Sequence, residues 1–325
     1  MSVGNLVAGY RTLAEVEAKA REYVLASHAP ATRRAYASAL SSYSLWCNAH
    51  GFEPYESNHR QVAMYLADRA TTLTVSSLRV HLAAIAVAHR ALTRAFDPKH
   101  ANIAQVLEGV ARKNGTRPTR QAKPAVFEDL SKMVAVCGTN TLGLRNRAML
   151  LVAFGAALRR SEAVNLDVGD VEFHENGIIL LIDRSKTDQH ARGVSIAIHD
   201  SDDDALSVTK AIKDWLVVYQ PKSLTSPLFC GLNKAHRMTG ERMNSKVLER
   251  LIKETAIKAE LPMPHLYSGH SLRSGLLTSA SEHQALLPDI MRQSRHKSPD
   301  VALSYMRTTK LWENNVTSKV FGRKS

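Results

Sequence analysis

Apolar residues recur at helical spacing through the first third of the chain, between residues 10 and 112. Because positions i, i+3, i+4 and i+7 share one face of a helix, this spacing predicts amphipathic helices that pack on one another. Gly51, Pro54 and Pro98 fall between apolar segments and indicate turns. The pattern predicts a helical first domain over residues 1–111. The segments are TLAEVEAKAREYVLASH, ATRRAYASALSSYSLWCNAHG, NHRQVAMYLADRA, TVSSLRVHLAAIAVAHRAL and NIAQVLEGVARK.

The pattern of the second part of the chain, residues 125–325, is mixed. LRNRAMLLVAFGAAL predicts a strongly apolar helix, and another helix starts near Arg159. The pair Asn176-Gly177 between apolar runs is typical of a tight β-hairpin, and a strand, GVSIAI, follows a loop over residues 184–192. We therefore predict a mainly α fold with a small antiparallel β-sheet in the second domain, an α+β protein.

Helices resume from about Asp203 in the predicted second domain. Ser298-Pro299-Asp300 is a good helix start, because Ser caps the helix and Pro suits its first turn. Tyr305 then lies about two turns into this last helix. A tail follows in which Leu311, Trp312, Val316, Val320 and Phe321 form an apolar stripe on one helix face.

A basic segment over residues 112–124, RKNGTRPTRQAKP, separates the two parts. It contains no acid, and its Gly and Pro residues are typical of a linker. The chain has a formal net charge of +13, which favours a polyanionic partner, above all nucleic acid, over a surface that is basic only for solubility. Residues 1–124 hold 16 Lys and Arg against 8 Asp and Glu, a net of +8, and the larger remainder holds a net of +5.

Other features of the sequence exclude several protein classes. The three cysteines lie far apart, which argues against a disulfide framework and favours a reducing compartment. The first residues resemble no signal peptide, and no apolar run is long enough for a membrane span. We expect a soluble protein of the cytoplasm, associated with the nucleoid if it is encoded by a bacterium, phage or plasmid.

No cofactor or metal is expected from the motifs. The chain has no GxGxxG after a strand, no GxxxxGK[ST], no HExxH and no cluster of acids with the spacing of a two-metal nuclease. A phosphate would therefore be handled by side-chain cations. Arg binds two phosphate oxygens with its planar fork, and a Tyr near cations is a credible nucleophile, since we expect its phenol to lose its proton more readily there.

Three motifs near these cations carry a family resemblance. ALRRSEAVNL resembles the first arginine motif of the tyrosine site-specific recombinases, GHSLRSG their HxxR motif, and RHKSPDVALSYMR the motif that contains the nucleophilic tyrosine. RSKTDQHARG places Lys186 between two predicted strands, where the family keeps its catalytic lysine. The domain layout is similar to that of Cre and the lambda-type integrases. Each motif residue alone is more often a surface, loop or core-edge residue, but an ordered set at these separations favours one site.

The resemblance implies a mechanism that needs neither metal nor ATP. Arg159 and Arg273 would clamp the scissile phosphate with hydrogen bonds from His270 and His296. Tyr305 would attack phosphorus and form a 3′-phosphotyrosine link. The two remaining residues carried over are Lys186, which would protonate the 5′-hydroxyl leaving group, and Glu162, which would orient its neighbours in the site.

Two departures from the family pattern concern the subfamily rather than the reaction. Many members read Leu-Gly-His before the last helix, where this chain reads Ser294-Arg295-His296. Many also read HxLRH, where this chain has Ser274 after Arg273. Arg160 stands beside Arg159, and the Arg-x-x-Glu spacing to Glu162 selects Arg159.

The resemblance also implies partners. The family acts on double-stranded DNA at recombination sites with inverted repeats, as a homotetramer that joins two sites, and its members serve mobile elements among other roles. The apolar tail would dock on a neighbouring subunit, with packing on its own domain as the alternative. Candidate DNA contacts are cations in and next to the first domain: Arg33, Arg34, Arg79, His81, Arg112, Lys113, Arg117, Arg120 and Lys123.

Two other functions stay open at this point. A type IB topoisomerase uses a similar set of residues, although the small helical first domain and the apolar tail favour recombination. A DNA-binding regulator without chemistry is the second alternative. The sequence does not reveal the target site, the need for accessory proteins, or the choice among integration, excision, inversion and dimer resolution.

Overall fold

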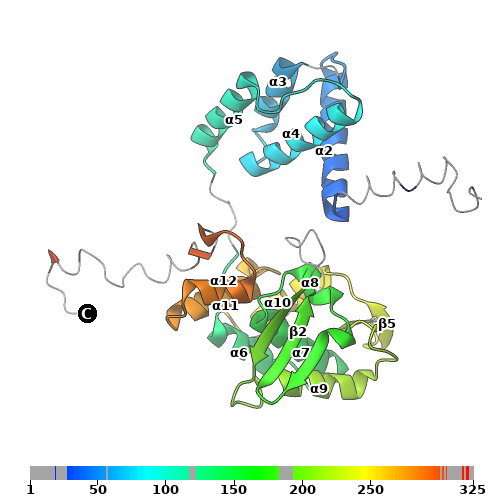
Figure 1. The fold of residues 1–325 in the computed structure, drawn as a ribbon, viewed down its shortest axis with the longest axis vertical. Coiled ribbons are helices and arrows are strands. Elements are labelled where there is room, and N and C mark those ends of the chain that lie inside the picture. The colour runs from blue at the N-terminus through cyan, green and yellow to red at the C-terminus, as the bar shows by residue number, and fades with distance from the viewer. Residues whose placement is uncertain are drawn as a thin grey trace, which may run out of the picture. The chain divides into compact units, whose positions relative to one another are not determined.

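The chain divides into two compact units, Met1–Thr119 and Arg120–Ser325, in the computed structural model (Figure 1). Each unit has a hydrophobic core of its own. The structure describes residues 19, 28–55, 58–116, 122–182, 193–300, 302, 303, 305, 317, 320 and 321. The fold is mainly helical with small antiparallel sheets, which confirms the predicted α+β class.

The described part of the first unit is helical, and polar side chains begin two of its helices. Asn58 and Thr74 accept hydrogen bonds from backbone N–H groups in the first turns of α3 and α4. Gln61 places an amide in this core, and its Nε2 contacts the Tyr43 hydroxyl, the Cys47 thiol and a backbone carbonyl. The buried amide nitrogen is thus well satisfied. The helices are α2 (Pro30–Ala49), α3 (His59–Arg69), α4 (Val75–Ala91) and α5 (Ala101–Asn114).

The structure shifts one predicted boundary in this unit. Helix α5 continues to Asn114, and Gly115 follows with φ +73°. Arg112 and Lys113 of the predicted linker therefore belong to the last turn of a helix, where cations suit the negative end of the helix dipole. The predicted first helix, TLAEVEAKAREYVLASH, lies largely outside the described residues.

The second unit is built around α7, whose residues Met149–Phe154 are all buried. A helix that is apolar on every side belongs in a core. The helices packed on α7 include α6, α9 and α11. The unit's α-helices are α6 (Phe127–Ala135), α7 (Thr141–Gly155), α8 (Arg160–Asn165), α9 (Val208–Tyr219), α10 (Lys246–Lys258), α11 (Ser271–Glu282) and α12 (Leu287–Ser294), with 3₁₀ turns at Val168–Asp170 and Pro264–Leu266.

A three-stranded antiparallel sheet in the order β1-β2-β3 covers one side of this core. Its strands are β1 (Val171–His174), β2 (Gly177–Ile182) and β3 (Val194–His199). The predicted hairpin is confirmed, although the pairing of His174 with Gly177 puts the turn at Glu175-Asn176, one residue early. Gly155 at the end of α7 has no side chain that would separate the helix from β3. An added Cβ would lie 2.6 Å from the Ile198 Cγ2 atom. The sheet can therefore pack closely on the helix.

A second hairpin was not predicted from the sequence. It is formed by β4 (Cys230–Leu232) and β5 (Met238–Arg242), which pair antiparallel with an irregular register. Both strands are short, and Gly231 and Gly240 interrupt their apolar pattern. Among the described residues, no helix is long and apolar enough to cross a membrane.

Close backbone packing brings the start of the second unit against α11. The Ala125 N–H donates to the Ser271 carbonyl over 2.9 Å. A Cβ added to Gly275, one turn further along α11, would lie 1.7 Å from the Ala125 carbonyl oxygen. No flexible side chain is available to move away, so the glycine of GHSLRSG is a packing requirement at this point.

Gly275→Ala should therefore destabilise the protein, by about 1–3 kcal/mol, because overpacking against backbone forces helix α11 to move. The matched control is Gly109→Ala within α5, where an added Cβ meets no atom within 4 Å. This control should stabilise its helix by about 0.5–1 kcal/mol. Thermal unfolding of both variants followed by circular dichroism measures the two effects. An unchanged or raised midpoint for Gly275→Ala would contradict the packing argument.

Candidate active site

Four helix termini of the second unit meet where the predicted catalytic residues gather. His270 and Arg273 lie at the N-terminus of α11, and Arg159 is the N-cap of α8. His296 follows the C-terminus of α12 by two residues. Helix α7 ends at the same place, where its carbonyl groups lack partners within the helix. In Figure 1 the labelled helices α8, α11 and α12 lie on the same side of this unit.

Arg273 is the most buried cation of the cluster, with a residue exposure of 1%. Its Nη1 donates to the Ala157 carbonyl over 2.6 Å, and its Nη2 donates to the Ser294 carbonyl. Burial, together with the nearby Arg159 and Arg295 guanidinium groups, lowers the pKa of Arg273 to about 10. The guanidinium is thus held by neutral carbonyl oxygens at the ends of α7 and α12, and it stays charged at neutral pH.

Glu162 fixes the orientation of Arg159. Its Oε1 accepts from the Arg159 Nη1 atom over 2.6 Å, and its Oε2 accepts from the Arg159 backbone N–H over 2.8 Å. The adjacent Arg160 turns away and pairs with Glu249 on α10. Gly269 leaves room for this course, since an added Cβ would lie 2.0 Å from the Arg160 Cδ atom. The two neighbouring arginines therefore have different partners, Glu162 for Arg159 and Glu249 for Arg160.

The phenol of Tyr305 lies between the two histidines. His270 Nε2 and the Tyr305 hydroxyl are 2.7 Å apart. The His296 ring stacks near the tyrosine ring, with centroids 6.3 Å apart and planes at 16°. The Tyr305 side chain also packs on a small apolar cluster that includes Leu277 and Ile290. The Tyr305 hydroxyl thus lies beside a residue of the same chain, His270, whose ring nitrogen Nε2 can accept its proton.

The pKa values in the cluster reflect its positive charge. Burial and the neighbouring arginines lower the pKa of His296 to about 4 and also lower the pKa of His270. We expected cations to lower the pKa of the tyrosine, and this expectation was wrong in its net direction. Burial raises the pKa of Tyr305, and Arg273 opposes the rise only in part. At neutral pH the site therefore holds a neutral phenol and neutral imidazoles.

Comparisons with known proteins agree with this geometry. The profile of the phage integrase family matches residues 126–311 of the chain. An integrase/recombinase XerD homolog of Selenomonas ruminantium is 28% identical over 311 residues, which cover 94% of this chain and 89% of the relative. The recombinase Cre of Escherichia phage P1 is 25% identical over 293 residues, covering 83% and 82% of the two chains.

The chain belongs to the phage integrase family. It is a tyrosine recombinase, an enzyme that cleaves and rejoins DNA strands in site-specific recombination. Topoisomerase and non-catalytic regulator, the two alternatives left by the sequence, are not favoured by these relatives.

Solved structures share the fold. The XerH site-specific recombinase in a post-cleavage complex with palindromic difH aligns with a TM-score of 0.63 at 15% identity, covering 89% of this chain and 79% of that one. A lambda integrase dimer bound to a COC′ core site aligns with a TM-score of 0.56 at 15% identity, covering 89% and 75%.

Sequence reasoning missed Arg295 of the recombinase. Its Nη2 forms an ion pair of 2.8 Å with the Glu162 Oε2 atom, and its Nη1 donates to the Ala156 carbonyl over 2.8 Å. The carbonyl of Ser294, which holds Arg273, was missed as well. The signal in the sequence was the departure from Leu-Gly-His, which we had assigned to subfamily variation alone.

The candidate DNA contacts have different surroundings in the structure. Arg33, Arg34 and Arg79 are exposed on α2 and α4. His81 contacts the Tyr65 hydroxyl over 2.7 Å, and burial lowers its pKa. Lys123 donates to the Pro262 carbonyl over 3.3 Å and lies over the Tyr267 ring. Arg112 pairs with Glu108 over 2.5 Å. Three of the candidates, His81, Lys123 and Arg112, thus have partners within the protein. Lys186, Arg117 and Arg120 lie outside the described residues.

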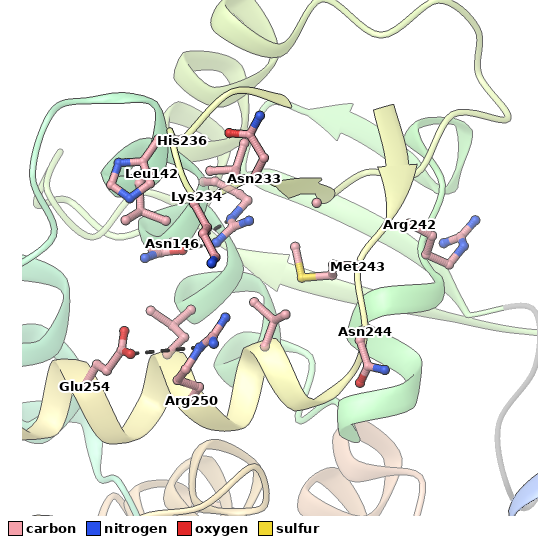
Figure 2. Close-up of a pocket in the computed structure, with 15 residues that line it drawn as sticks. Leu142, Asn146, Asn233, Lys234, His236, Arg242, Met243, Asn244, Arg250 and Glu254 are labelled. Atoms are coloured by element: carbon pink, nitrogen blue, oxygen red, sulfur yellow. Dashed lines mark hydrogen bonds and ion pairs between the residues drawn. The ribbon is translucent and has the colours of Figure 1, made fainter. Parts of the chain in front are cut away.

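A groove of about 540 Å³ lies apart from Tyr305, between the β4–β5 hairpin and α10 (Figure 2). Its walls carry Lys234, His236 and Arg250, the last of which pairs with Glu254. The buried Arg145 at its edge donates to the Cys230 carbonyl over 3.3 Å. None of the predicted catalytic residues that the structure describes lines this groove, so the concave shape alone does not mark the reaction centre.

The depressed histidine pKa values can be tested in the free protein. Replacing Arg159 by Gln removes a positive charge that disfavours both imidazolium forms, so the pKa values of His270 and His296 should rise. The matched control is Arg160→Gln, since Arg160 faces Glu249 and should leave both values unchanged. Histidine ring signals followed by NMR against pH measure the midpoints. Equal midpoints in the wild type and Arg159→Gln would contradict the electrostatic account.

Proposed function

We propose that Tyr305 is the nucleophile of the recombinase and attacks the scissile phosphate of a DNA strand held by Arg159 and Arg273. The observation that carries this proposal is the 2.7 Å separation of the Tyr305 hydroxyl and His270 Nε2, beside the Arg273 guanidinium. A phenol with a raised pKa needs a base, and a neutral imidazole at hydrogen-bond distance can accept its proton. His270 is therefore assigned as that base, in addition to the phosphate-binding role that the resemblance implies.

In the proposed step the Tyr305 oxygen replaces the 5′-oxygen on phosphorus. The Tyr305 oxygen forms a bond to phosphorus as its proton passes to His270, and the bond from phosphorus to the 5′-oxygen breaks. The product is a 3′-phosphotyrosine link and a free 5′-hydroxyl. Arg159 and Arg273 stabilise the charge on the non-bridging oxygens with donors that are fixed before the reaction. Glu162 orients Arg159, and His296 flanks the tyrosine ring.

Lys186 is the proposed acid that protonates the departing 5′-oxygen. Its position in the sequence supports this role, since it lies between β2, which ends at Ile182, and β3, which begins at Val194. Ile182, the last residue of β2, lines one pocket together with Glu162, the carboxylate that holds Arg159. An ammonium group on a long side chain is suited to deliver a proton to an alkoxide.

The proposed substrate is double-stranded DNA with inverted repeats, bound by four copies that join two sites. A lambda integrase tetramer bound to a Holliday junction supports this, since it aligns with a TM-score of 0.55. We assign phosphate contacts to the exposed Arg33, Arg34 and Arg79, and a further electrostatic contribution to the other basic residues around the linker. The apolar tail from Leu311 to Phe321 would join neighbouring subunits.

The enzyme is proposed to act in the cytoplasm, in contact with the nucleoid. Its proposed role is the recombination of a mobile element. The phage integrase profile and the phage P1 relative support a role in the movement or maintenance of such an element. The DNA next to the chain's own gene is the first place to look for its site.

Tyr305→Phe should bind DNA but form no covalent adduct, because it keeps the ring and lacks the attacking oxygen. Nicked duplexes that tile the DNA around the chain's own gene would trap the wild type. The short strand between the cleavage point and the nick, which carries the free 5′-hydroxyl, diffuses away, so the strand cannot be rejoined. Denaturing gels detect the adduct, and mass spectrometry identifies the linked residue. An adduct on a residue other than Tyr305, or one formed by Tyr305→Phe, would overturn the assignment.

Lys186→Ala should slow strand cleavage by about 10²–10⁴-fold, the usual contribution of a positioned acid. A substrate with sulfur in place of the 5′-bridging oxygen should restore the rate, because a thiolate leaves without being protonated. The measurement is single-turnover cleavage with both substrates. Loss of rate on both substrates would show that Lys186 acts elsewhere than on the leaving group.

A further inference from the structure

Arg295 adopts a backbone conformation that ordinarily suits glycine. Its φ and ψ angles are +59° and +36°, in the left-handed region, where a Cβ atom is disfavoured. Its side chain is 5% exposed, and its Nε atom has no hydrogen-bond partner within the described part of the chain. Strain and an unsatisfied donor are both unfavourable, so the guanidinium group needs a compensating role.

The guanidinium group joins the two halves of the phosphate clamp. It shares Glu162 with Arg159, since both arginines donate to the carboxylate, and it shares the Ala157 carbonyl with Arg273. Residues on either side contribute as well: the Ser294 carbonyl accepts from Arg273, and His296 Nδ1 lies 2.9 Å from the Ser294 hydroxyl. The tight turn after α12 therefore contacts Arg273 directly, through the Ser294 carbonyl, and Arg159 through the shared Glu162 carboxylate.

The charge balance of the cluster depends on this residue. Glu162 by itself would neutralise Arg159 and leave a net charge of +1 with Arg273. With Arg295 the three guanidinium groups and one carboxylate sum to +2. The Arg295 charge also repels Arg159, which offsets part of the attraction between Arg159 and the Glu162 carboxylate. Both effects leave Arg159 better able to bind an anion.

We propose that Arg295 is a positioning residue for DNA strand cleavage. It acts through Glu162 and keeps the donors and charge of Arg159 available to the scissile phosphate. This proposal rests on the assignment of Tyr305 and the two clamping arginines given above. It predicts that the contribution of Arg295 to the cleavage rate disappears when Glu162 loses its charge.

A double-substitution cycle tests the coupling. The variants are Arg295→Gly, Glu162→Gln and the two combined, with Tyr305→Phe as the inactive reference. Glycine suits the left-handed backbone, so Arg295→Gly removes the guanidinium group without adding strain. Arg292→Ala is the matched control, because Arg292 lies on the same helix in an exposed pair with Asp289. The measurement is the single-turnover rate of adduct formation with saturating protein, below the thermal midpoint of every variant.

Arg295→Gly should slow adduct formation by about tenfold or more, while DNA affinity changes by about threefold or less. In the Glu162→Gln background the same substitution should change the rate by less than about threefold. Arg295→Lys, with one charged nitrogen in place of a fork, should give an intermediate rate. Arg292→Ala should match the wild type.

A purely structural role would make the two substitutions additive in rate, and that result would overturn the proposal. An unchanged rate in Arg295→Gly with a normal wild-type adduct would overturn it too, and leave the assignment of Tyr305 intact. A wild type that forms no adduct at Tyr305 would overturn both. If Arg295→Gly fails to fold, Arg295→Lys in the two backgrounds provides the same cycle.

Discussion

A single buried carboxylate has to serve two guanidinium groups in a site that must remain positive. Glu162 is 3% exposed, and the adjacent Arg273 has no carboxylate of its own among the described residues. Buried charges need partners, yet an acid for each arginine would cancel the charge that binds phosphate. The ends of helices α7 and α12 resolve this conflict. The carbonyl groups at and just past these ends, those of Ala156, Ala157 and Ser294, accept from the guanidinium groups and hold them without neutralising their charge.

This arrangement explains why the proposed catalytic groups come from helix termini that are distant in sequence. Inside a helix the N–H and carbonyl groups already bond one another, so they are less available to a charged side chain. At a terminus such groups are available, and Arg273 and Arg295 use the carbonyl groups at the end of α7. The N-terminus of α8 has the opposite polarity and suits the Glu162 carboxylate. The geometry of the clamp thus follows from where the helices begin and end.

The parts of this site that follow a spacing rule could be predicted from the sequence. Arg159 and Glu162 share one helical turn, as do His270 and Arg273, and a Ser-Pro helix start placed Tyr305. The role of Arg295 could not be predicted, because it depends on a left-handed turn and on a partner 133 residues away. Similarly, nothing in the local pattern revealed that Tyr65 holds His81, and the β4–β5 strands were too short for their periodicity to be read.

The protonation state of the free site also limits when it can react. The Ser294 hydroxyl has one hydrogen, which it donates to the Ile290 carbonyl over 2.6 Å, so its contact with His296 Nδ1 requires an N–H on that ring nitrogen. With its pKa lowered to about 4, His296 then lacks a proton on Nε2 at neutral pH and has no ring donor left for a phosphate.

A phosphodiester between Arg159 and Arg273 would cancel part of the surplus charge that keeps both imidazoles neutral. Their pKa values would rise, since an anion favours the imidazolium form. His296 would then become able to donate from Nε2, and His270 would become a stronger base toward the Tyr305 phenol. In the free protein the same surplus charge keeps His270 a weak base beside a phenol whose pKa is raised. The positive charge proposed to attract DNA would therefore also delay activation of the proposed nucleophile until a phosphate has arrived.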